Sequence, residues 1–384
     1  MTPPQIPVFD IRIEPQDLEA VERTLRSGWL SAGPETEAFE REFAEHLGAK
    51  HVLATSSCTT ALHLACVVAG VGPGDEVIVP SLTFAATANA VRYTGATPVF
   101  AEMVGADGDL NIDVVAVEAA IGPRTRAVIP VHWAGYPIEI ERLIELCEAR
   151  GLTVIEDAAH SPWAHYGSRQ LGTYGLAGCF SFFPNKVLGV GEGGALCTDS
   201  DEVAERVRRL RSQGMSASTI DRQRGKAMGY DVEELGYNYR FDDLRASLLR
   251  SRFARLGGEV ERRRELIGRY RELLGGHELL GIAYGTHDVS RSSCYLMGIL
   301  VEPEMRSKVR NRLNDEHGIQ TTVYPATHQL TAYVQTYGEV SLPLTERAAS
   351  SLFSIPLFPH LTDEQQDRVG AAVVESVERV TEAG

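Results

Sequence analysis

The sequence predicts an α/β protein in which helices cover both faces of a mainly parallel sheet, followed by a smaller α/β domain. Strand-like apolar runs alternate with helical segments from residue 51 to residue 156, the order that builds a parallel sheet. The 384 residues exceed the usual size of one hydrophobic core. From about Gly257 helical patterns dominate and strands become fewer. We therefore expect a large domain over residues 1–250, including N-terminal helices, and a small domain over residues 251–384.

The N-terminal segment is expected to be helical. Residues 14–26 have a helical periodicity that places Leu18, Val21 and Leu25 on one face. A second amphipathic helix should run through residues 39–47, where apolar residues recur four positions apart.

Strands and helices alternate through the rest of the large domain. A strand begins at Glu76 and ends in a turn, and later strands are expected at 97–101, 127–131 and 152–156, with helices at 85–93, 114–121 and 137–149. A short strand at 195–198 and helices at 203–210 and 244–256 follow. The charged run at 261–265 carries both signs and indicates a solvated helical face.

Composition excludes several classes of function. The net charge is −15 and no long basic block occurs, which argues against a nucleic-acid or anionic-membrane surface. The six cysteines are scattered without C-x-x-C spacing, as reduced core cysteines are, and no metal site is expected. No N-terminal targeting pattern appears, and no apolar run is long enough to span a bilayer. A cytoplasmic location is therefore expected.

A single lysine follows an apolar run. Residues 180–186 read F-S-F-F-P-N-K, and a glycine-rich segment follows Lys186. Burial removes the hydration of an ammonium group, so Lys186 either extends to solvent or is held for chemistry. Desolvation lowers the pKa of a lysine and frees its amine as a nucleophile toward carbonyls, as a Schiff base requires.

The glycines after this lysine allow a second interpretation. Gly189, Gly191 and Gly194 match G-x-G-x-x-G, the dinucleotide fingerprint. That fingerprint needs a strand before it and a helix after it, whereas Pro184 interrupts the approach and residues 195–198 indicate a strand. A hairpin of small residues, which lets the backbone approach a bound group closely, fits better.

An acid and a histidine follow the strand expected at 152–156. In open α/β sheets such strand ends face the ligand crevice. Asp157 could there hold a proton on a heterocyclic nitrogen, and His160 could stack on a ring or hydrogen-bond to it. The alternatives are a helix N-cap for Asp157 and a surface imidazole for His160.

A strand also runs into small polar residues and then into a helix between residues 51 and 65. Exposed N–H groups and the helix dipole at such a junction form an anion site, to which Thr59 can add a hydroxyl. An ordinary Ser/Thr N-cap is the alternative.

Together these segments resemble the DegT/DnrJ/EryC1/StrS family, pyridoxal-phosphate-dependent sugar aminotransferases of fold type I. The similarity rests on D-A-A-H at 157–160, F-S-F-x-P-x-K at 180–186 and G-E-G-G at 191–194. It extends to P-S-x-T-F at 80–84, H-x-x-G-x-P at 132–137 and G-Y-N-Y-R at 236–240, and so spans nearly the whole chain. The resemblance implies a mainly parallel seven-stranded sheet flanked by helices.

The resemblance also implies a role for each cofactor-binding residue. Lys186 would hold pyridoxal phosphate as a Schiff base and move the proton, while Asp157 keeps the pyridine nitrogen protonated. His160 and Phe84 would fix the plane of the ring, although an ordinary core phenylalanine is the alternative for Phe84. The remaining residues concern the phosphate: Ser181, Thr59 and Asn238 from the partner subunit would anchor it, and Cys58 stands where the family has the glycine of S-G-T.

By family precedent, an amino acid donor, glutamate or glutamine, would supply nitrogen to a keto sugar nucleotide in amino-deoxysugar biosynthesis. The resemblance also implies a homodimer in which both subunits contribute to each active site. The alternatives are a keto cyclitol acceptor in natural-product biosynthesis and a non-catalytic regulator that binds pyridoxal phosphate. A related dehydratase carries histidine in place of the lysine, so Lys186 argues against dehydration. Tyr324 and His328 are the candidates for substrate contact, in a loop one residue shorter than the family's. Trp163 could reshape the pocket or pack beneath it.

Overall fold

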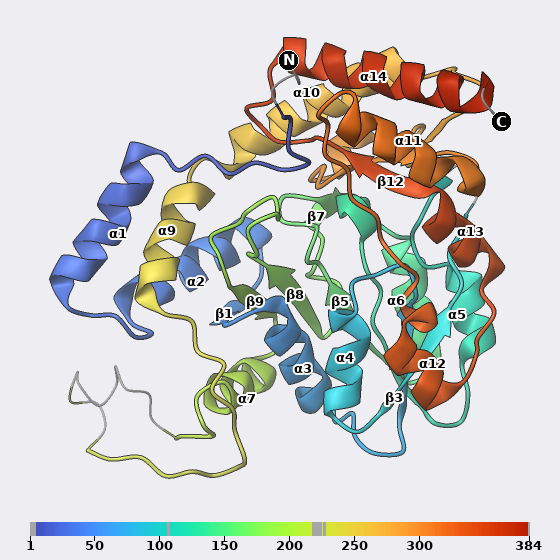
Figure 1. Cartoon of the computed structure of the whole chain (residues 1–384). Helices are drawn as coiled ribbons and strands as arrows, with labels where there is room; N and C mark the ends of the chain where they lie inside the picture. The colour runs from blue at the N-terminus through green and yellow to red at the C-terminus, as the bar shows by residue number, and fades with distance from the viewer. Residues whose placement is uncertain (1–4, 106–107, 217–224, 226–227, 383–384) are drawn as a thin grey trace.

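The computed structural model describes residues 5–105, 108–216, 225 and 228–382. Residues 1–4, part of the segment expected to lack a targeting signal, lie outside these ranges. The central feature is a seven-stranded sheet in the spatial order β1-β9-β8-β5-β4-β2-β3 (Figure 1). Its strands are β1 (His51–Thr55), β2 (Glu76–Pro80), β3 (Thr97–Ala101), β4 (Thr125–Val128), β5 (Thr153–Asp157), β8 (Ala177–Ser181) and β9 (Gly194–Thr198). Only β9 runs antiparallel to its neighbours, so the mainly parallel sheet is confirmed.

Helices cover both faces of this sheet because adjacent strand residues point in opposite directions. Val77 and Ile155 share one apolar cluster with helices α3 (Cys58–Val68), α4 (Ala86–Tyr93) and α7 (Asp201–Leu210). Their neighbours Ile78 and Val154 pack on the opposite face with α5 (Val114–Ala120) and α6 (Ile140–Ala149). Further along that second face lies α2 (Pro34–Leu47), against β8 and β9.

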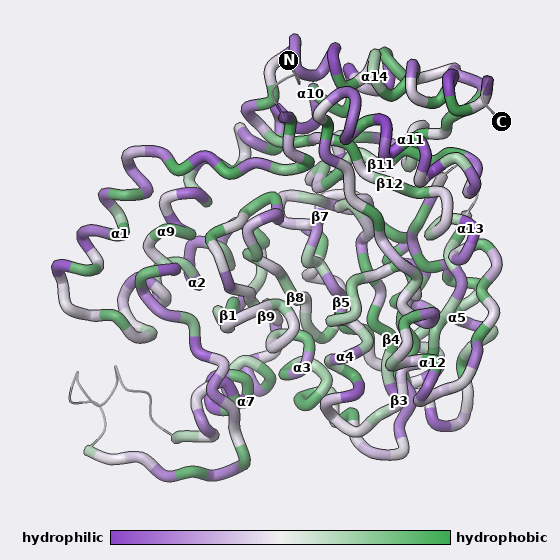
Figure 2. Tube along the Cα trace, in the orientation of Figure 1, coloured by the Kyte–Doolittle hydropathy of each residue, from purple (hydrophilic) through white to green (hydrophobic). Residues whose placement is uncertain are grey.

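A second layer is built by the C-terminal part of the chain, at the top of Figure 1. The antiparallel strands β10 (Gly281–Ile282), β11 (Met297–Leu300) and β12 (Leu352–Ile355) pack with α10 (Leu256–Leu274), α11 (Pro303–Asp315) and α14 (Asp363–Glu382) around their own apolar cluster. Figure 2 shows both hydrophobic and hydrophilic residues along α14, as expected for a helix with one buried face. Ile6 joins this cluster, so the N-terminal segment crosses to the C-terminal layer.

The expected boundary at residue 250 falls inside α9 (Asp243–Phe253). We propose that the division between the domains lies instead at residues 254–255, between α9 and α10. Within the described residues, the remaining helices are α1 (Pro15–Ser27), α12 (Thr331–Tyr337) and α13 (Pro343–Ser351). The same residues also form the hairpin β6 (His165–Tyr166) with β7 (Arg169–Gln170) and the short 3₁₀ turns η2 (Trp133–Gly135), η3 (Val289–Arg291) and η4 (Thr327–Gln329). None of the helices in the described ranges is long and apolar enough to cross a membrane.

The helix expected at residues 14–26 is confirmed as α1, but the leucines of its apolar face are exposed. Leu18 and Leu25 are 65% and 54% exposed, whereas Asp17 is fully buried. The reason is an ion pair, because both carboxylate oxygens of Asp17 accept hydrogen bonds from Arg255 at 2.8 Å. A buried carboxylate requires such a partner, and the helix turns toward it.

The prediction of a solvated charged run at 261–265 is wrong at Arg263. This side chain is 4% exposed, and its Nη1 donates to the carbonyl oxygen of Leu357 at 3.0 Å. Strand β4 also ends earlier than expected, at Val128, because Pro130 has no N–H to donate to the sheet.

Candidate active site

The carboxyl ends of the parallel strands meet at one edge of the sheet and border a cavity of about 380 Å³. Asp157 ends β5, Ser181 ends β8, and Phe84 follows β2. Ligands bind at this edge in open α/β sheets. Eight of the residues expected at the site line the cavity: Cys58, Thr59, Phe84, Asp157, His160, Ser181, Lys186 and Tyr324.

The first turn of α3 borders the cavity with its N-terminus. The Ser57 hydroxyl accepts from the N–H of Thr60 at 3.2 Å, and the Thr60 hydroxyl accepts from the N–H of Ser57 at 3.1 Å. These reciprocal caps leave the N–H groups of Cys58 and Thr59 without a partner among the described residues. The helix dipole and such N–H groups favour an anion. Cys58 does not have a positive φ, so this position does not require the family's glycine.

The chain between β8 and β9 holds Lys186 at the cavity wall. The N–H of Phe182 donates to the Gly193 carbonyl at 2.9 Å, and the N–H of Val190 donates to the Phe182 carbonyl at 2.9 Å. The lysine Nζ lies 4.5 Å from the centroid of the Tyr295 ring. Burial lowers the pKa of Lys186 to about 8, although attraction to Asp157 opposes that shift. About one tenth of the amine is therefore unprotonated at pH 7, far more than for a lysine with its ordinary pKa.

The Asp157 carboxylate is held by two donors. Oδ2 accepts from the Thr87 hydroxyl at 2.8 Å, and Oδ1 accepts from the N–H of Ala159 at 3.1 Å. Burial raises the pKa of Asp157, while both hydrogen bonds and the Lys186 charge act in the opposite direction. The carboxylate is thus fixed in orientation, with the lysine as its cationic neighbour in the cavity.

His160 lies against Tyr295 in a stacked arrangement. The ring centroids are 4.2 Å apart with an interplanar angle of 20°, and Nδ1 accepts from the N–H of Ala134 at 3.3 Å. Burial lowers the pKa of His160 well below its ordinary value, and repulsion by Lys186 adds to the effect. The imidazole is therefore neutral at pH 7 and available for stacking rather than for charge pairing.

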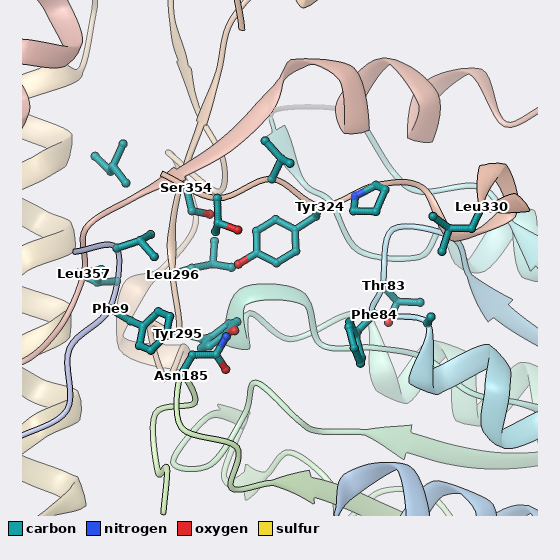
Figure 3. A pocket seen from close by; sticks show the side chains of 16 residues that line it. Phe9, Thr83, Phe84, Asn185, Tyr295, Leu296, Tyr324, Leu330, Ser354 and Leu357 are labelled. Carbon is teal, nitrogen blue, oxygen red and sulfur yellow. The ribbon is translucent and has the colours of Figure 1, made fainter. Parts of the chain in front are cut away.

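Phe84 is 76% exposed, although it belongs to a loop between two buried elements. It borders both the active-site cavity and an outer cavity of about 330 Å³ (Figure 3). Figure 3 shows Phe84 and Tyr324 projecting into the outer cavity from opposite sides, with Asn185 and Tyr295 nearby. An exposed aromatic face of this kind suits stacking on a planar group.

Asn238 and His328 do not line the active-site cavity. Asn238 is exposed and pairs through its backbone with Ser212 in an isolated bridge. His328 is 2% exposed, with Nδ1 at 2.6 Å from the Ser81 hydroxyl and Nε2 at 3.3 Å from Glu346. His328 therefore links η4 to the turn after β2 and to α13.

Trp163 packs against α2 and α9 rather than lining the active-site cavity. Its ring stacks on His46 at 3.9 Å between centroids and contacts Phe253 at 6.2 Å. Trp163 does not line the cavity. Of the two alternatives that the sequence left open, the structure shows the packing role.

Thr87, Asn185 and Tyr295 are among the residues at the site that were not anticipated from the sequence. Thr87 lies about one helical turn after Phe84, and Asn185 directly precedes the lysine, so both positions could have been found by extending the motifs. Tyr295 comes from the C-terminal layer, before β11, and no local pattern marks it.

The donor set fits pyridoxal phosphate. An amine with a pKa near 8 can react with the aldehyde, and the free N–H groups of Cys58 and Thr59 can take the phosphate. Asp157 offers a carboxylate to the pyridine nitrogen, and Phe84 offers an exposed ring face.

Comparisons with known proteins agree with this fit. The model of the DegT/DnrJ/EryC1/StrS aminotransferase family matches residues 12–374. The spore coat polysaccharide biosynthesis protein SpsC of Bacillus subtilis is 40% identical over 367 residues, which cover 93% of each chain.

Solved structures show the same fold. DesV of S. venezuelae has a TM-score of 0.90 and 37% identity, with 98% of this chain and 99% of that one covered. The aminotransferase TlmJ of Streptoalloteichus hindustanus has a TM-score of 0.90 and 35% identity, with 98% and 100% covered. Further similar structures carry the cofactor as pyridoxal or pyridoxamine phosphate. The chain belongs to the DegT/DnrJ/EryC1/StrS family and is a pyridoxal-phosphate-dependent aminotransferase of fold type I, in a family of sugar aminotransferases.

Proposed function

We propose that this enzyme transfers an amino group from glutamate or glutamine to the keto carbon of a sugar nucleotide, in the biosynthesis of an amino-deoxysugar. The observation that carries the proposal is the placement of Lys186 and Asp157 in one cavity, with a lysine pKa of about 8. The similarity to SpsC, a protein named for polysaccharide biosynthesis, supports a sugar acceptor.

Each cofactor-binding residue has a separate role in the proposed reaction. The bound cofactor supplies an electrophilic aldehyde carbon and a ring that accepts electrons when a proton leaves the carbon next to nitrogen. Lys186 is the base that takes this proton and returns it to the adjacent carbon, because its amine has a near-neutral pKa. Asp157, held by Thr87 and the N–H of Ala159, keeps the ring nitrogen protonated. His160 and Phe84 hold the plane of the ring.

The phosphate would be bound by the N–H groups of Cys58 and Thr59 and by the Ser181 and Thr59 hydroxyls. We also propose a homodimer in which the partner subunit's Asn238 completes each phosphate site. The exposure of Asn238, away from the cavity of its own chain, supports this arrangement. An amide donor suits a phosphate oxygen.

All six cysteines are free and buried, which supports a reducing compartment such as the cytoplasm.

One observation favours a keto cyclitol as the acceptor. The outer cavity is lined by 16 described residues, and none of their side chains carries a charge. Its surface is mainly apolar and aromatic, and the lining residues with hydroxyls are Thr83, Tyr295, Thr322, Tyr324 and Ser354. An uncharged cyclitol needs no cation, whereas the diphosphate of a sugar nucleotide would need cations from elsewhere, such as the partner subunit.

The test combines one variant with a panel of acceptors. Lys186→Ala should lose both the visible absorption of the lysine-bound cofactor and turnover, because no other amine lines the cavity among the described residues. Lys308→Ala, an exposed lysine on α11, is the matched control and should behave as wild type. Normal transamination by Lys186→Ala would refute the assignment.

The acceptor is identified by mass spectrometry of the products from keto sugar nucleotides and keto cyclitols, with glutamate as donor. Amination of nucleotides alone supports the first proposal, and amination of cyclitols alone supports the second. A yellow protein that aminates no acceptor would indicate a regulator that binds the cofactor without catalysis.

A further inference from the structure

A second cavity, of about 270 Å³, lies next to the active-site cavity and shares two residues with it. Asn185 and Lys186 line both cavities, so the lysine stands at their junction. The other walls are the N-terminal segment from Phe9 to Gln16, the ends of α9 and α10, and the loop after β12. We call this space the basic cavity, because four arginines line it: Arg12, Arg252, Arg255 and Arg263.

Two of these arginines have acidic partners. Arg255 donates to Asp17 at 2.8 Å and to Glu259 at 2.9 Å. Arg12 lies 4.0 Å from Glu14. The wall also contains His360, which is 2.7 Å from Asp10. The acidic residues that line the basic cavity are therefore each already paired.

Arg252 and Arg263 have no carboxylate within 4.0 Å among the described residues, although they are only 6% and 4% exposed. The Nε of each has no hydrogen-bond partner there either. Arg252 makes one long bond, from Nη1 to the Arg12 carbonyl at 3.4 Å, and Arg263 donates from Nη1 to backbone carbonyls only.

Burial lowers the pKa of both guanidinium groups, that of Arg263 to about 10, and the attraction of Glu259 only partly offsets the effect. Buried charges in proteins are normally paired, because an unpaired one loses its hydration without compensation. Two adjacent guanidinium groups without a counter-ion therefore indicate that the cavity takes an anion.

The position of the cavity relates this anion to the reaction. Arg263 Nη1 lies 3.5 Å from the carbonyl oxygen of Tyr295, whose ring is 4.5 Å from the lysine Nζ. Asn185, at the junction, has a buried Oδ1 without a partner. An amino acid whose carboxylate lies in the basic cavity could extend past Asn185 and bring its amine to the position of Lys186.

The size of the basic cavity favours a carboxylate over a nucleotide. The volume is below the roughly 300–1,000 Å³ that is typical of sites for drug-sized ligands. A guanidinium group matches a carboxylate through two parallel hydrogen bonds, and phosphate oxygens offer similar acceptors. The experiment must therefore distinguish a donor carboxylate from the diphosphate of an acceptor.

We propose that the basic cavity binds a carboxylate group of the amino acid donor and that Arg252 and Arg263 are its counter-ions. This assignment rests on the proposed aminotransferase function with a carboxylate-bearing donor. It makes the two arginines substrate-binding residues that do not line the outer cavity, although the two cavities adjoin at Phe9 and Asn185, so donor and acceptor would be recognised by different side chains.

The test measures binding without turnover. Glutarate has both carboxylates of glutamate but no amine, so its dissociation constant can be measured by calorimetry on the full-length, cofactor-loaded protein. Arg252→Gln should weaken glutarate about 10- to 100-fold, the usual effect of losing a charge-assisted hydrogen-bonded partner. Arg252→Lys keeps the positive charge but loses the two parallel N–H donors of the guanidinium group, so it should weaken glutarate binding less than Arg252→Gln does.

The matched control is Arg250→Gln, two residues earlier on α9. Arg250 is already bound by Glu35 and Glu42 at 2.6 Å and does not line the basic cavity. Glutarate should bind this variant as it binds wild type. Uridine diphosphate, as the acceptor-side probe, should bind Arg252→Gln and wild type equally, and only the KM for glutamate should rise.

Three results would overturn the proposal: wild type that does not bind glutarate, Arg252→Gln that binds it unchanged, or Arg252→Gln that loses uridine diphosphate instead. The proposed function fails separately. A protein that binds glutarate through Arg252 but aminates no acceptor would retain the carboxylate site and lose the transaminase assignment. Thermal unfolding of each variant verifies that the fold is intact.

Discussion

Gly194, at the start of β9, lies directly against the N-terminus of α3. A methyl group added at this position should push these two parts of the cofactor site apart. A Cβ at this position would lie 2.3 Å from the carbonyl carbon of Ser57 and 2.4 Å from the nitrogen of Cys58. Ordinary contact begins near 3.4 Å, so Gly194→Ala must move β9 and the N-terminus of α3 apart by about 1 Å (3.4 − 2.4). Both obstacles are backbone atoms, which cannot rotate away.

We expect two consequences of Gly194→Ala. Overpacking of this kind costs about 1–3 kcal/mol of unfolding free energy. A displacement of about 1 Å between catalytic groups can reduce the rate by about 100-fold. Urea denaturation measures the first effect, and titration with pyridoxal phosphate, followed by visible absorption and then by turnover, measures the second.

The control is Gly268→Ala in the interior of α10, where an added Cβ meets nothing within 4 Å. This variant should be stabilised by about 0.5–1 kcal/mol, because glycine is unfavourable in a helix interior. If Gly194→Ala bound the cofactor and unfolded like wild type, the close approach of β9 to α3 could not be what shapes the anion site.

Three further outcomes are expected. In the cofactor-free protein, acylation of Lys186, followed by mass spectrometry, should be half-maximal near pH 8. Asp157→Asn should lower this midpoint, because the aspartate charge favours the ammonium form of the lysine. A higher midpoint would contradict the interaction between the two side chains. Asp17→Asn should cost about 1–3 kcal/mol at pH 7 in urea denaturation, because Arg255 loses its buried carboxylate and keeps only Glu259 as a charged partner. The pKa of Asp17 is lowered in the fold, so its contribution is complete above the unfolded value near 3.8 and is lost as the pH falls through the folded pKa; the variant should lack this acid-dependent loss. Trp163→Ala should cost about 3 kcal/mol yet leave the KM for the acceptor unchanged, and a changed KM would place the indole in the substrate path.

The sheet and the cofactor-binding edge were predictable because their signals are local. Apolar runs define the start of β2 and both ends of β3 and β5 to within one residue, and Asp157 and Lys186 follow such runs directly. Local periodicity also identified α1 as a helix. Its buried face could not be predicted, because it is decided by Arg255, which lies 238 residues after Asp17.

The same limit applies to the far wall of the site. Tyr295 and Arg263 come from the C-terminal layer, and nothing in their immediate neighbours distinguishes them from other aromatic or charged residues. In sequence, Arg263 belongs to a run of mixed charge that is typical of solvent-facing helices. Only the packing of α10 against residues 294–295, which precede β11, and against the loop after β12 shows that its charge is buried.

The reversed direction of β9 has a consequence for how the reactive amine is delivered. A parallel successor to β8 would require the chain to leave the ligand edge and return across a face of the sheet. With β9 reversed, the chain turns back at that edge, and the segment between Phe182 and Gly193 stays anchored to paired strands on both sides. Lys186 therefore lies in a twelve-residue connection that is anchored at both ends by paired strands, and not in a long crossover. We expect that inserting residues into this connection would displace the lysine amine from the cavity.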